Sequence, residues 1–353
     1  MKTRTLLLSL LMLALFCNAC KNDDPELQTA YLELPGQPLD YGQFNDHIPT
    51  LGRVLFYDPQ LSVNNSVSCA TCHKQVLAFS DNTALSKGFE NRLTTRNSMP
   101  IQNLAVSSFG IPASLFWDGR ENNLRQMVMR PIVNHIEMGI SDPEVLARKL
   151  SVVPYYRDLF KNAYGTEEVT SAGIAEGLSS FLASITSTNT KFDRHNFQGE
   201  KLTALEEKGK ALFIGTYDCN ACHQVQNPSG YIFAGTFSNI GLEDNYADNG
   251  LENTTGHRSD AGKFKIPSLR NVMLTAPYMH DGRFSTLEAV MDHYSEGIED
   301  HPNLDPRLRS ATGEPLNMHI PEDDKTAIIA FLNTLTDTHM ITDPKFSNPF
   351  KAR

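Results

Sequence analysis

The segment SCATCHKQ (Ser68–Gln75) places two cysteines three residues apart and follows the second directly with a histidine. The segment DCNACHQV (Asp218–Val225) repeats this CxxCH pattern in the second half of the chain. One helical turn with this spacing presents both sulfur atoms and the adjacent imidazole to one side. The pattern predicts a c-type haem at each segment, attached by thioether bonds and with the histidine as proximal iron ligand. The predicted attachment residues are Cys69, Cys72 and His73, then Cys219, Cys222 and His223.

Three other interpretations explain the two motifs less well. A thioredoxin-type redox pair needs a single CxxC within a βαβ unit. A zinc site that joins both CxxC pairs would leave the histidine after each pair without a role. Chance accounts poorly for two copies in a chain with six cysteines, of which the other two are Cys17 and Cys20. An exported protein usually forms disulfides from its cysteines. Haem attachment would use all four motif cysteines and leave none of them for a disulfide, so the cysteine count is consistent with it.

The first twenty residues have the layout of a bacterial export signal. Basic residues precede an apolar run from Leu6 to Phe16, which is too short to span a bilayer stably. Cys20 also resembles a lipoprotein site, where cleavage leaves an N-terminal cysteine that carries lipid. Simple cleavage after Ala19 is the alternative. Both interpretations predict a periplasmic protein, either free or anchored to a membrane as a lipoprotein.

Length and charge narrow the class of protein further. A chain of 353 residues suggests two domains, and 40% hydrophobic residues can form a sizeable core. The net charge of −10 argues against nucleic acid as a partner, because phosphates would repel it.

Three further pairs of segments repeat between the halves of the chain. LGRVLF and KGKALF precede the two CxxCH motifs, WDGRENNL and HDGRFSTL share D-G-R-x-x-x-L, and TRN is echoed by LRN. Their positions are Leu51–Phe56 and Lys208–Phe213, Trp117–Leu124 and His280–Leu287, and Thr95–Asn97 and Leu269–Asn271. Such internal similarity predicts two related haem domains, with the polar stretch Asn189–Glu200 as the joint.

The predicted fold is mainly α, with two related cytochrome c-like haem domains and long loops. Glu168–Ile185 has apolar residues at helical intervals, and SDPE from Ser141 and STLE from Ser285 each resemble a capping box. Pro321–Asp337 predicts a last helix with an acidic first turn. The predicted organisation is a signal peptide (1–19), an N-terminal linker (20–45), a first haem domain (46–198), a second haem domain (199–345) and a tail (346–353).

Seven segments together resemble the bacterial di-haem cytochrome c peroxidases and their MauG-type relatives: SCATCH, TRNSMP, LFWDGR, IEM, CNACH, IPSLRNV and TAPYMHDG. The likeness runs from LGRVLFYDPQLS to the final helix. It implies that the first haem is high-spin and reacts with hydrogen peroxide. It also implies that the second, six-coordinate haem relays electrons from a small donor protein, a cytochrome c or a cupredoxin.

The resemblance implies two residues of the reaction. Glu137 in IEMG matches the family's distal acid, which would move a proton from one peroxide oxygen to the other. From the residues alone, Glu137 could instead close a helix or pair with Arg130. Trp117, the only tryptophan, matches the aromatic residue between the two haems, as an electron path or a packing wall. From the residues alone, a single tryptophan is more often a core residue.

Two departures from the family pattern concern the iron ligands. Glu90 stands where many members carry a histidine that caps the first iron, so the resemblance implies an open position there, with His135 as an alternative cap. Tyr294 stands where peroxidases carry the methionine ligand of the second haem. A tyrosine resembles the MauG branch and would lower the reduction potential. Met279 and Met291 are the alternative ligands.

The resemblance also implies one calcium ion between the domains. Its ligands would be Asn97 and the backbone oxygens of Thr275 and Pro277, an oxygen-only set that suits calcium. From the residues alone, these positions are ordinary turn residues. A homodimer is left open.

Three functions remain in competition. The first is a peroxidase that reduces hydrogen peroxide with electrons from a small redox protein. The second is a MauG-like oxidase that uses peroxide to oxidise residues of a partner protein. The third is an electron carrier or haem sensor without turnover, against which Glu137 beside an open iron position argues.

Overall fold

The computed structural model describes residues 31–34, 37–104, 114–225 and 237–351. The predicted signal peptide and Cys20 lie outside these residues. The chain forms two units, of which the smaller contains the antiparallel pair β1 (Tyr31–Leu32) and β4 (Phe350–Lys351). The larger unit comprises Leu34–Pro349 and holds both CxxCH motifs.

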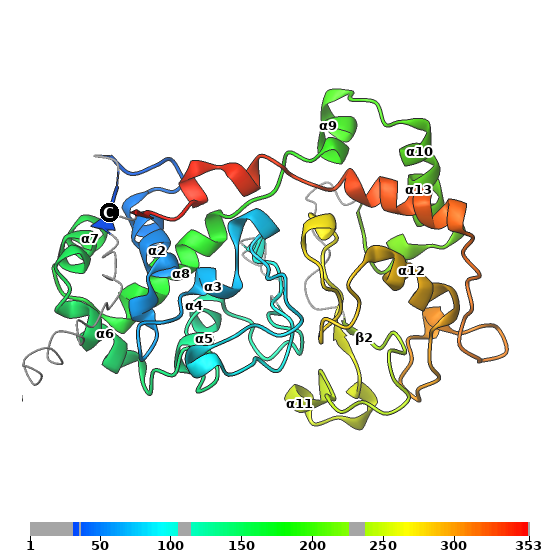
Figure 1. Ribbon diagram of the computed structural model, residues 1–353, viewed down its shortest axis with the longest axis horizontal. Coiled ribbons are helices and arrows are strands. Elements are labelled where there is room, and N and C mark those ends of the chain that lie inside the picture. The colour runs from blue at the N-terminus through cyan, green and yellow to red at the C-terminus, as the bar shows by residue number, and fades with distance from the viewer. Residues whose placement is uncertain (1–30, 35–36, 105–113, 226–236, 352–353) are drawn as a thin grey trace, which may run out of the picture. The chain divides into compact units, whose positions relative to one another are not determined.

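The larger unit is mainly helical, as the sequence predicts (Figure 1). Among its described residues, β2 (Phe237–Ser238) pairs antiparallel with β3 (Phe264–Lys265). No helix in the described part of the chain is both long and apolar enough to cross a bilayer. The helices are α2 (His47–Tyr57), α3 (Cys69–Cys72), α4 (Leu124–Met127), α5 (Arg130–Val133), α6 (Pro143–Ser151), α7 (Pro154–Tyr164), α8 (Ser171–Ser184), α9 (Lys191–Gln198), α10 (Ala204–Ala211), α11 (Glu252–Thr255), α12 (Leu287–Glu296) and α13 (Glu322–Asn333).

In the first half, α2 crosses α8 with backbone against backbone. A Cβ atom added at Gly52 would lie 1.9 Å from Gly177 O and 2.7 Å from Phe181 Cβ, so only glycine permits this approach. Phe56, one turn further along α2, packs against Phe181 with ring centroids 5.3 Å apart. Both phenylalanines are fully buried.

The second half repeats this crossing with α10 and α13 (Figure 1). A Cβ atom at Gly209 would lie 1.8 Å from Ala327 O and 2.9 Å from Phe331 Cβ. Phe213 packs against Phe331 at 5.5 Å between ring centroids. Gly52 and Gly209 hold the same position in LGRVLF and KGKALF, so the sequence repeat corresponds to a repeated helix packing.

The two D-G-R segments also fold alike. Gly119 and Gly282 both have positive φ, +65° and +69°, which a side chain would disfavour. Isolated bridges flank each turn, Leu115 with Glu121 and Tyr278 with Phe284. The second pair of repeats is therefore a repeated turn.

Two helix starts differ by one residue from the sequence prediction. The cap of α6 is Asp142, whose carboxylate accepts from Glu144 N at 2.7 Å, because Pro143 occupies the first helical position. The cap of α12 is Thr286, whose hydroxyl accepts from Ala289 N at 3.2 Å. The predicted caps Ser141 and Ser285 are therefore wrong by one position. The last helix, α13, begins with the predicted acidic turn.

Most of the predicted joint at Asn189–Glu200 forms the helix α9. Phe192 on this helix is 3% exposed and packs against Phe331, with ring centroids 5.3 Å apart. Asp193 pairs with Arg270 at 2.6 Å. These contacts place α9 on the core of the second half, although the prediction assigned it to the first domain.

The predicted tail also differs, because the chain returns to the first half before it ends. Phe346 is 1% exposed and packs against Phe79 and Phe181, at 6.3 Å in both cases. The Tyr57 hydroxyl donates to Phe346 O at 2.6 Å. In Figure 1 this last segment, drawn in red, passes beside α2. Phe346 is therefore a core residue of the first half.

The α2–α8 crossing predicts a large effect of one methyl group. We expect Gly52→Ala to lower the free energy of unfolding by about 3 kcal/mol, because the two backbones must separate. Gly215→Ala is the matched control, since no atom lies within 4 Å of a Cβ there. Denaturant titration followed by far-ultraviolet circular dichroism measures both. Equal losses in the two variants would contradict the packing argument.

Candidate functional site

The first CxxCH motif forms the single helical turn α3 and the residue that follows it. The Thr71 hydroxyl accepts from Ser68 N at 3.0 Å, which closes the start of the turn. The backbone N–H of His73 donates to Cys69 O at 2.9 Å. This turn brings Cys69, Cys72 and His73 to the wall of one cavity of about 200 Å³.

A backbone carbonyl fixes the ring of His73. Its Nδ1 donates to Phe79 O at 2.8 Å, and burial lowers the pKa of the imidazole. Because Nδ1 carries the proton, Nε2 keeps a free lone pair. A metal-binding histidine needs this tautomer, and such a hydrogen bond usually sets it.

The second motif reproduces the arrangement on a 3₁₀ turn, Cys219–Ala221. His223 N donates to Cys219 O at 2.9 Å, and His223 Nδ1 donates to Pro267 O at 3.1 Å. Burial lowers the pKa of His223 to about 4. Cys219, Cys222 and His223 line a second cavity of about 400 Å³.

The thiols do not have the properties of a redox-active pair. Burial raises the pKa of Cys69 to about 12, of Cys72 to about 11 and of Cys219 to about 12. A reactive CxxC needs a lowered thiol pKa. The two pairs also line separate cavities. Among the described residues, no group of three histidine, cysteine or acidic side chains could hold a metal ion by itself. These observations argue against both the thioredoxin and the zinc interpretation.

The residues of each cavity fit a c-type haem. Each offers two adjacent thiols, one neutral imidazole with its Nδ1 already bonded, and mostly apolar walls. The first cavity has Phe56, Val67, Leu115, Met127, Leu178 and Leu182 among its walls, and the second has Phe213, Ile266, Leu287, Val290, Met318 and Leu332.

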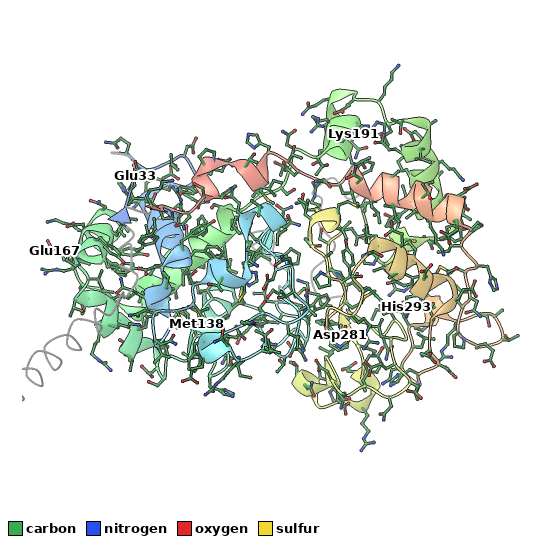
Figure 2. The ribbon with its side chains drawn as sticks, viewed as in Figure 1. Glu33, Met138, Glu167, Lys191, Asp281 and His293 are labelled. Atoms are coloured by element: carbon green, nitrogen blue, oxygen red, sulfur yellow. The ribbon has the colours of Figure 1, made fainter. Side chains whose placement is uncertain are left out.

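Glu137 lines the first cavity, on a turn between α5 and α6. Asn134 Nδ2 donates to Glu137 Oε1 at 3.0 Å. Burial raises the pKa of Glu137, and the Arg120 charge opposes this rise. Arg130 pairs with Glu121 instead, so the alternative Glu137–Arg130 pair is absent. In Figure 2 the neighbouring Met138 marks this region.

Neither Glu90, which stands in place of the capping histidine, nor His135, the alternative cap, lines the first cavity. Glu90 is exposed and pairs with Arg92 at 2.6 Å. His135 is exposed and does not line the cavity. Among the described residues that line it, His73 is the only histidine.

All three candidates for the second haem's other ligand line the second cavity: Tyr294, Met279 and Met291. The pKa of Tyr294 is raised, mainly by burial, with contributions from Cys219 and Cys222. The three candidate ligands thus line the same cavity, and which of them binds the iron stays a prediction.

The neighbouring histidine on α12 faces a different part of the fold. His293, labelled in Figure 2, is buried and donates from Nε2 to Ile240 O at 2.9 Å. It does not line the second cavity.

Four residues line both cavities: Asn97, Pro100, Trp117 and Lys265. Trp117 Nε1 donates to Asn97 O at 2.9 Å, and Lys265 N donates to Trp117 O at 2.8 Å. We call these four residues the shared wall. Trp117 thus lies at the boundary between the two cavities.

The three candidate calcium residues also gather at the second cavity, because Asn97, Thr275 and Pro277 all line it. The Asn97 side chain donates from Nδ2 to Thr83 O at 3.2 Å and to Ala84 O at 3.1 Å. Its backbone N–H donates to His280 O at 2.7 Å.

Sequence reasoning missed the charged residues around the shared wall. Arg96 Nε lies 2.6 Å from Asp248 Oδ2, and Arg96 Nη1 lies 2.6 Å from Asp118 Oδ2. The contact with Asp118 is an ion pair without hydrogen-bond alignment. Lys265 belongs to the shared wall. Arg96 falls inside the TRNSMP marker, whereas Lys265 only precedes IPSLRNV, so no motif indicated it.

Comparison with known proteins agrees with this geometry. The sequence profile of the di-haem cytochrome c peroxidases matches residues 47–201. The methylamine utilization protein MauG of Methylorubrum extorquens is 36% identical over 288 residues, covering 81% of this chain and 77% of that protein. The cytochrome c551 peroxidase of Nitrosomonas europaea is 31% identical over 296 residues, covering 83% of this chain and 80% of that protein.

A similar solved structure is that of a MauG-like protein associated with microbial copper homeostasis. It has a TM-score of 0.75 and 32% identity, and the match covers 90% of this chain and 97% of that one. Identity above 30% over more than 80% of the chain is too extensive for a shared fold alone. This chain therefore belongs to the di-haem cytochrome c peroxidase family, and it is an oxidoreductase of the cytochrome c peroxidase and MauG type.

Proposed function

We propose that this protein is a periplasmic di-haem peroxidase that reduces hydrogen peroxide to water. Each peroxide consumes two protons and two electrons and yields two waters. Cys69, Cys72 and His73 would hold the first haem, and Cys219, Cys222 and His223 the second. When bound, the first haem supplies the iron at which the O–O bond of peroxide is broken. The observation that carries the proposal is Glu137 in the first cavity, half-buried and with its pKa raised.

Glu137 supplies the proton transfer. A carboxyl with a raised pKa can take a proton from one oxygen of peroxide and return it to the departing oxygen near neutral pH. The Asn134 amide donates to Oε1 and so holds one carboxyl oxygen in place. An electron carrier has no use for such a group, which disfavours the third function.

The shared wall supports electron transfer from the second cavity to the first. Trp117 lines both cavities and is held on either side by backbone hydrogen bonds, through Asn97 O and Lys265 N. We assign it the role of electron path between the two haems. The donor would be a small redox protein, a cytochrome c or a cupredoxin.

A MauG-like oxidase is the second candidate, and Tyr294 favours it. A phenolate ligand stabilises oxidised iron, and Tyr294 lines the second cavity together with the two methionines. MauG of Methylorubrum extorquens is among the relatives above. In this function, residues of a docked protein would supply the electrons.

Location, assembly and calcium complete the proposal. An export signal at residues 1–19 would take the chain to the periplasm, and Cys20 would carry lipid if the lipoprotein site is used. A homodimer stays open. A calcium ion held by Asn97, Thr275 and Pro277 stays a prediction, in which neutral oxygens and water would complete the site.

Glu137→Gln tests the proton-transfer role. We expect kcat/KM for peroxide to fall by about 100-fold or more, since the amide cannot shuttle a proton. Steady-state oxidation of a reduced cytochrome c measures it. Glu90→Gln is the control, because Glu90 is exposed and outside the cavity. Undiminished turnover in Glu137→Gln, with both haems attached, would remove the catalytic assignment.

Tyr294→Phe tests the second haem's ligand. We expect the low-spin absorption and electron paramagnetic resonance signals of the ferric protein to change, and the potential of that haem to rise, because the phenolate is lost. Met279→Leu and Met291→Leu are the controls and should leave both signals unchanged. An unchanged Tyr294→Phe spectrum, with a changed methionine variant, would transfer the assignment to that methionine.

Peroxide titration of the ferric protein separates the two candidate functions. As a peroxidase, the protein should oxidise two molecules of a one-electron donor for each peroxide and should hold no oxidising equivalents for long without donor. Stopped-flow absorption measures both quantities. A state that retains two oxidising equivalents for minutes, and reacts poorly with cytochrome c and cupredoxin, would favour the MauG-like function instead.

A further inference from the structure

Lys265 is the only charged residue of the shared wall. It lies on β3, opposite Phe237 on β2, and its N–H donates to Trp117 O at 2.8 Å. Its side chain keeps some accessible surface because it borders the two cavities, yet protein atoms surround it closely enough to lower the ammonium pKa to about 8. Two separate cavities therefore share one half-buried lysine in their walls.

This ammonium has no counter-ion in the described part of the chain. No ion pair or side-chain hydrogen bond of Lys265 is present there, and burial is the sole cause of its pKa shift. Lys263, two residues earlier, pairs with Asp260 at 3.1 Å. An isolated buried ammonium is strongly unfavourable unless an anion accompanies it.

The nearby carboxyl groups are already committed. Arg96 pairs with both Asp118 and Asp248, and Arg120 also pairs with Asp118 at 3.0 Å. Glu137 lines the first cavity, but Arg120 is the only charged group that affects its pKa. Arg96 and Arg120 thus share the carboxylates of Asp118 and Asp248, and no carboxylate of the described residues pairs with Lys265.

The anion must then come from what fills the cavities. Family membership and the two CxxCH motifs give each cavity a haem, and each haem carries two propionate carboxylates as its only acidic groups. We propose that the Lys265 ammonium is the counter-ion of a haem propionate at the boundary between the two cavities. This inference rests on haem binding, as in the proposed function, but not on which reaction the haems carry out.

The pairing would tune electron exchange across the shared wall. An ammonium beside a propionate cancels a negative charge close to the iron, which disfavours the ferric state relative to the ferrous state. Removing the ammonium should therefore lower the reduction potential of the haem whose propionate it holds. Because Lys265 lines both cavities, this charge would act at the boundary between the two haem sites.

Three variants of the holoprotein test the inference. Lys265→Met removes the charge and keeps the length, Lys265→Arg keeps the charge, and Lys263→Met removes a half-buried lysine two residues earlier that pairs with Asp260. Spectroelectrochemical titration without peroxide gives both potentials, resonance Raman gives the propionate bending modes, and the pyridine haemochrome assay gives haem content.

We expect Lys265→Met to lower the potential of one haem and to shift its propionate mode. Lys265→Arg should keep the wild-type potential, and Lys263→Met should change neither the potential nor the propionate mode. Unchanged potentials and modes in Lys265→Met, with both haems attached, would overturn the pairing, as would wild-type potentials that vary with chloride or phosphate at constant ionic strength.

If Lys265→Met does not fold, Lys265→Arg decides alone. Its different hydrogen-bond geometry should shift the propionate mode, and a mode identical to wild type would overturn the pairing. Since none of these measurements uses peroxide, a failed pairing and a failed peroxidase assignment give different results.

Discussion

The fold depends on two places where helix backbones touch. At Gly52 and at Gly209 a carbonyl of the crossing helix occupies the space of a side chain, and a phenylalanine one turn on fills the adjacent layer. Each crossing fixes the helix that leads into a CxxCH turn, since α3 packs on α2 and the Cys219–Ala221 turn follows α10 through Leu212–Thr216. The cysteines can therefore sit on very short turns, because the long helices before them are held rigidly.

The two imidazoles are also held in the same way as each other, by backbone carbonyls. His73 and His223 each give Nδ1–H to a carbonyl of an irregular segment, Phe79 O and Pro267 O. Neither ring donates to a carboxylate. Burial lowers the pKa of His73, although the Asp81 charge acts on the ring and raises its pKa against the effect of burial. The linings of the two cavities differ as well. The first cavity contains a carboxyl, Glu137, and the second contains the phenol of Tyr294 and the candidate thioethers of Met279 and Met291.

Sequence patterns predicted what depends on local spacing. The CxxCH turns and the acidic start of α13 could be predicted because each lies within a few residues. The repeat could be predicted because each of its copies is a short segment with the same local pattern. Long-range contacts were not. Nothing near Phe346 in the sequence indicates that it packs beside Phe181. The stretch Lys191–Gln198 is mostly polar, so its composition did not indicate that Phe192 is buried in the core. Lys265 could not be recognised from the sequence either. A lysine between two apolar residues is ordinary, and only the structure shows that no described carboxylate pairs with it.

The shared wall shows why this architecture tolerates different chemistries. Its connections run through the main chain: Asn97 N to His280 O, Lys265 N to Trp117 O, and Trp117 Nε1 to Asn97 O. Two of these three bonds involve no side chain, so substitution of Asn97 or Lys265 would leave them in place. The first half supplies Asn97 and Trp117, and the second supplies Lys265. Backbone pairing across the halves thus joins the walls of the two cavities, while the side chains of these residues can vary in charge.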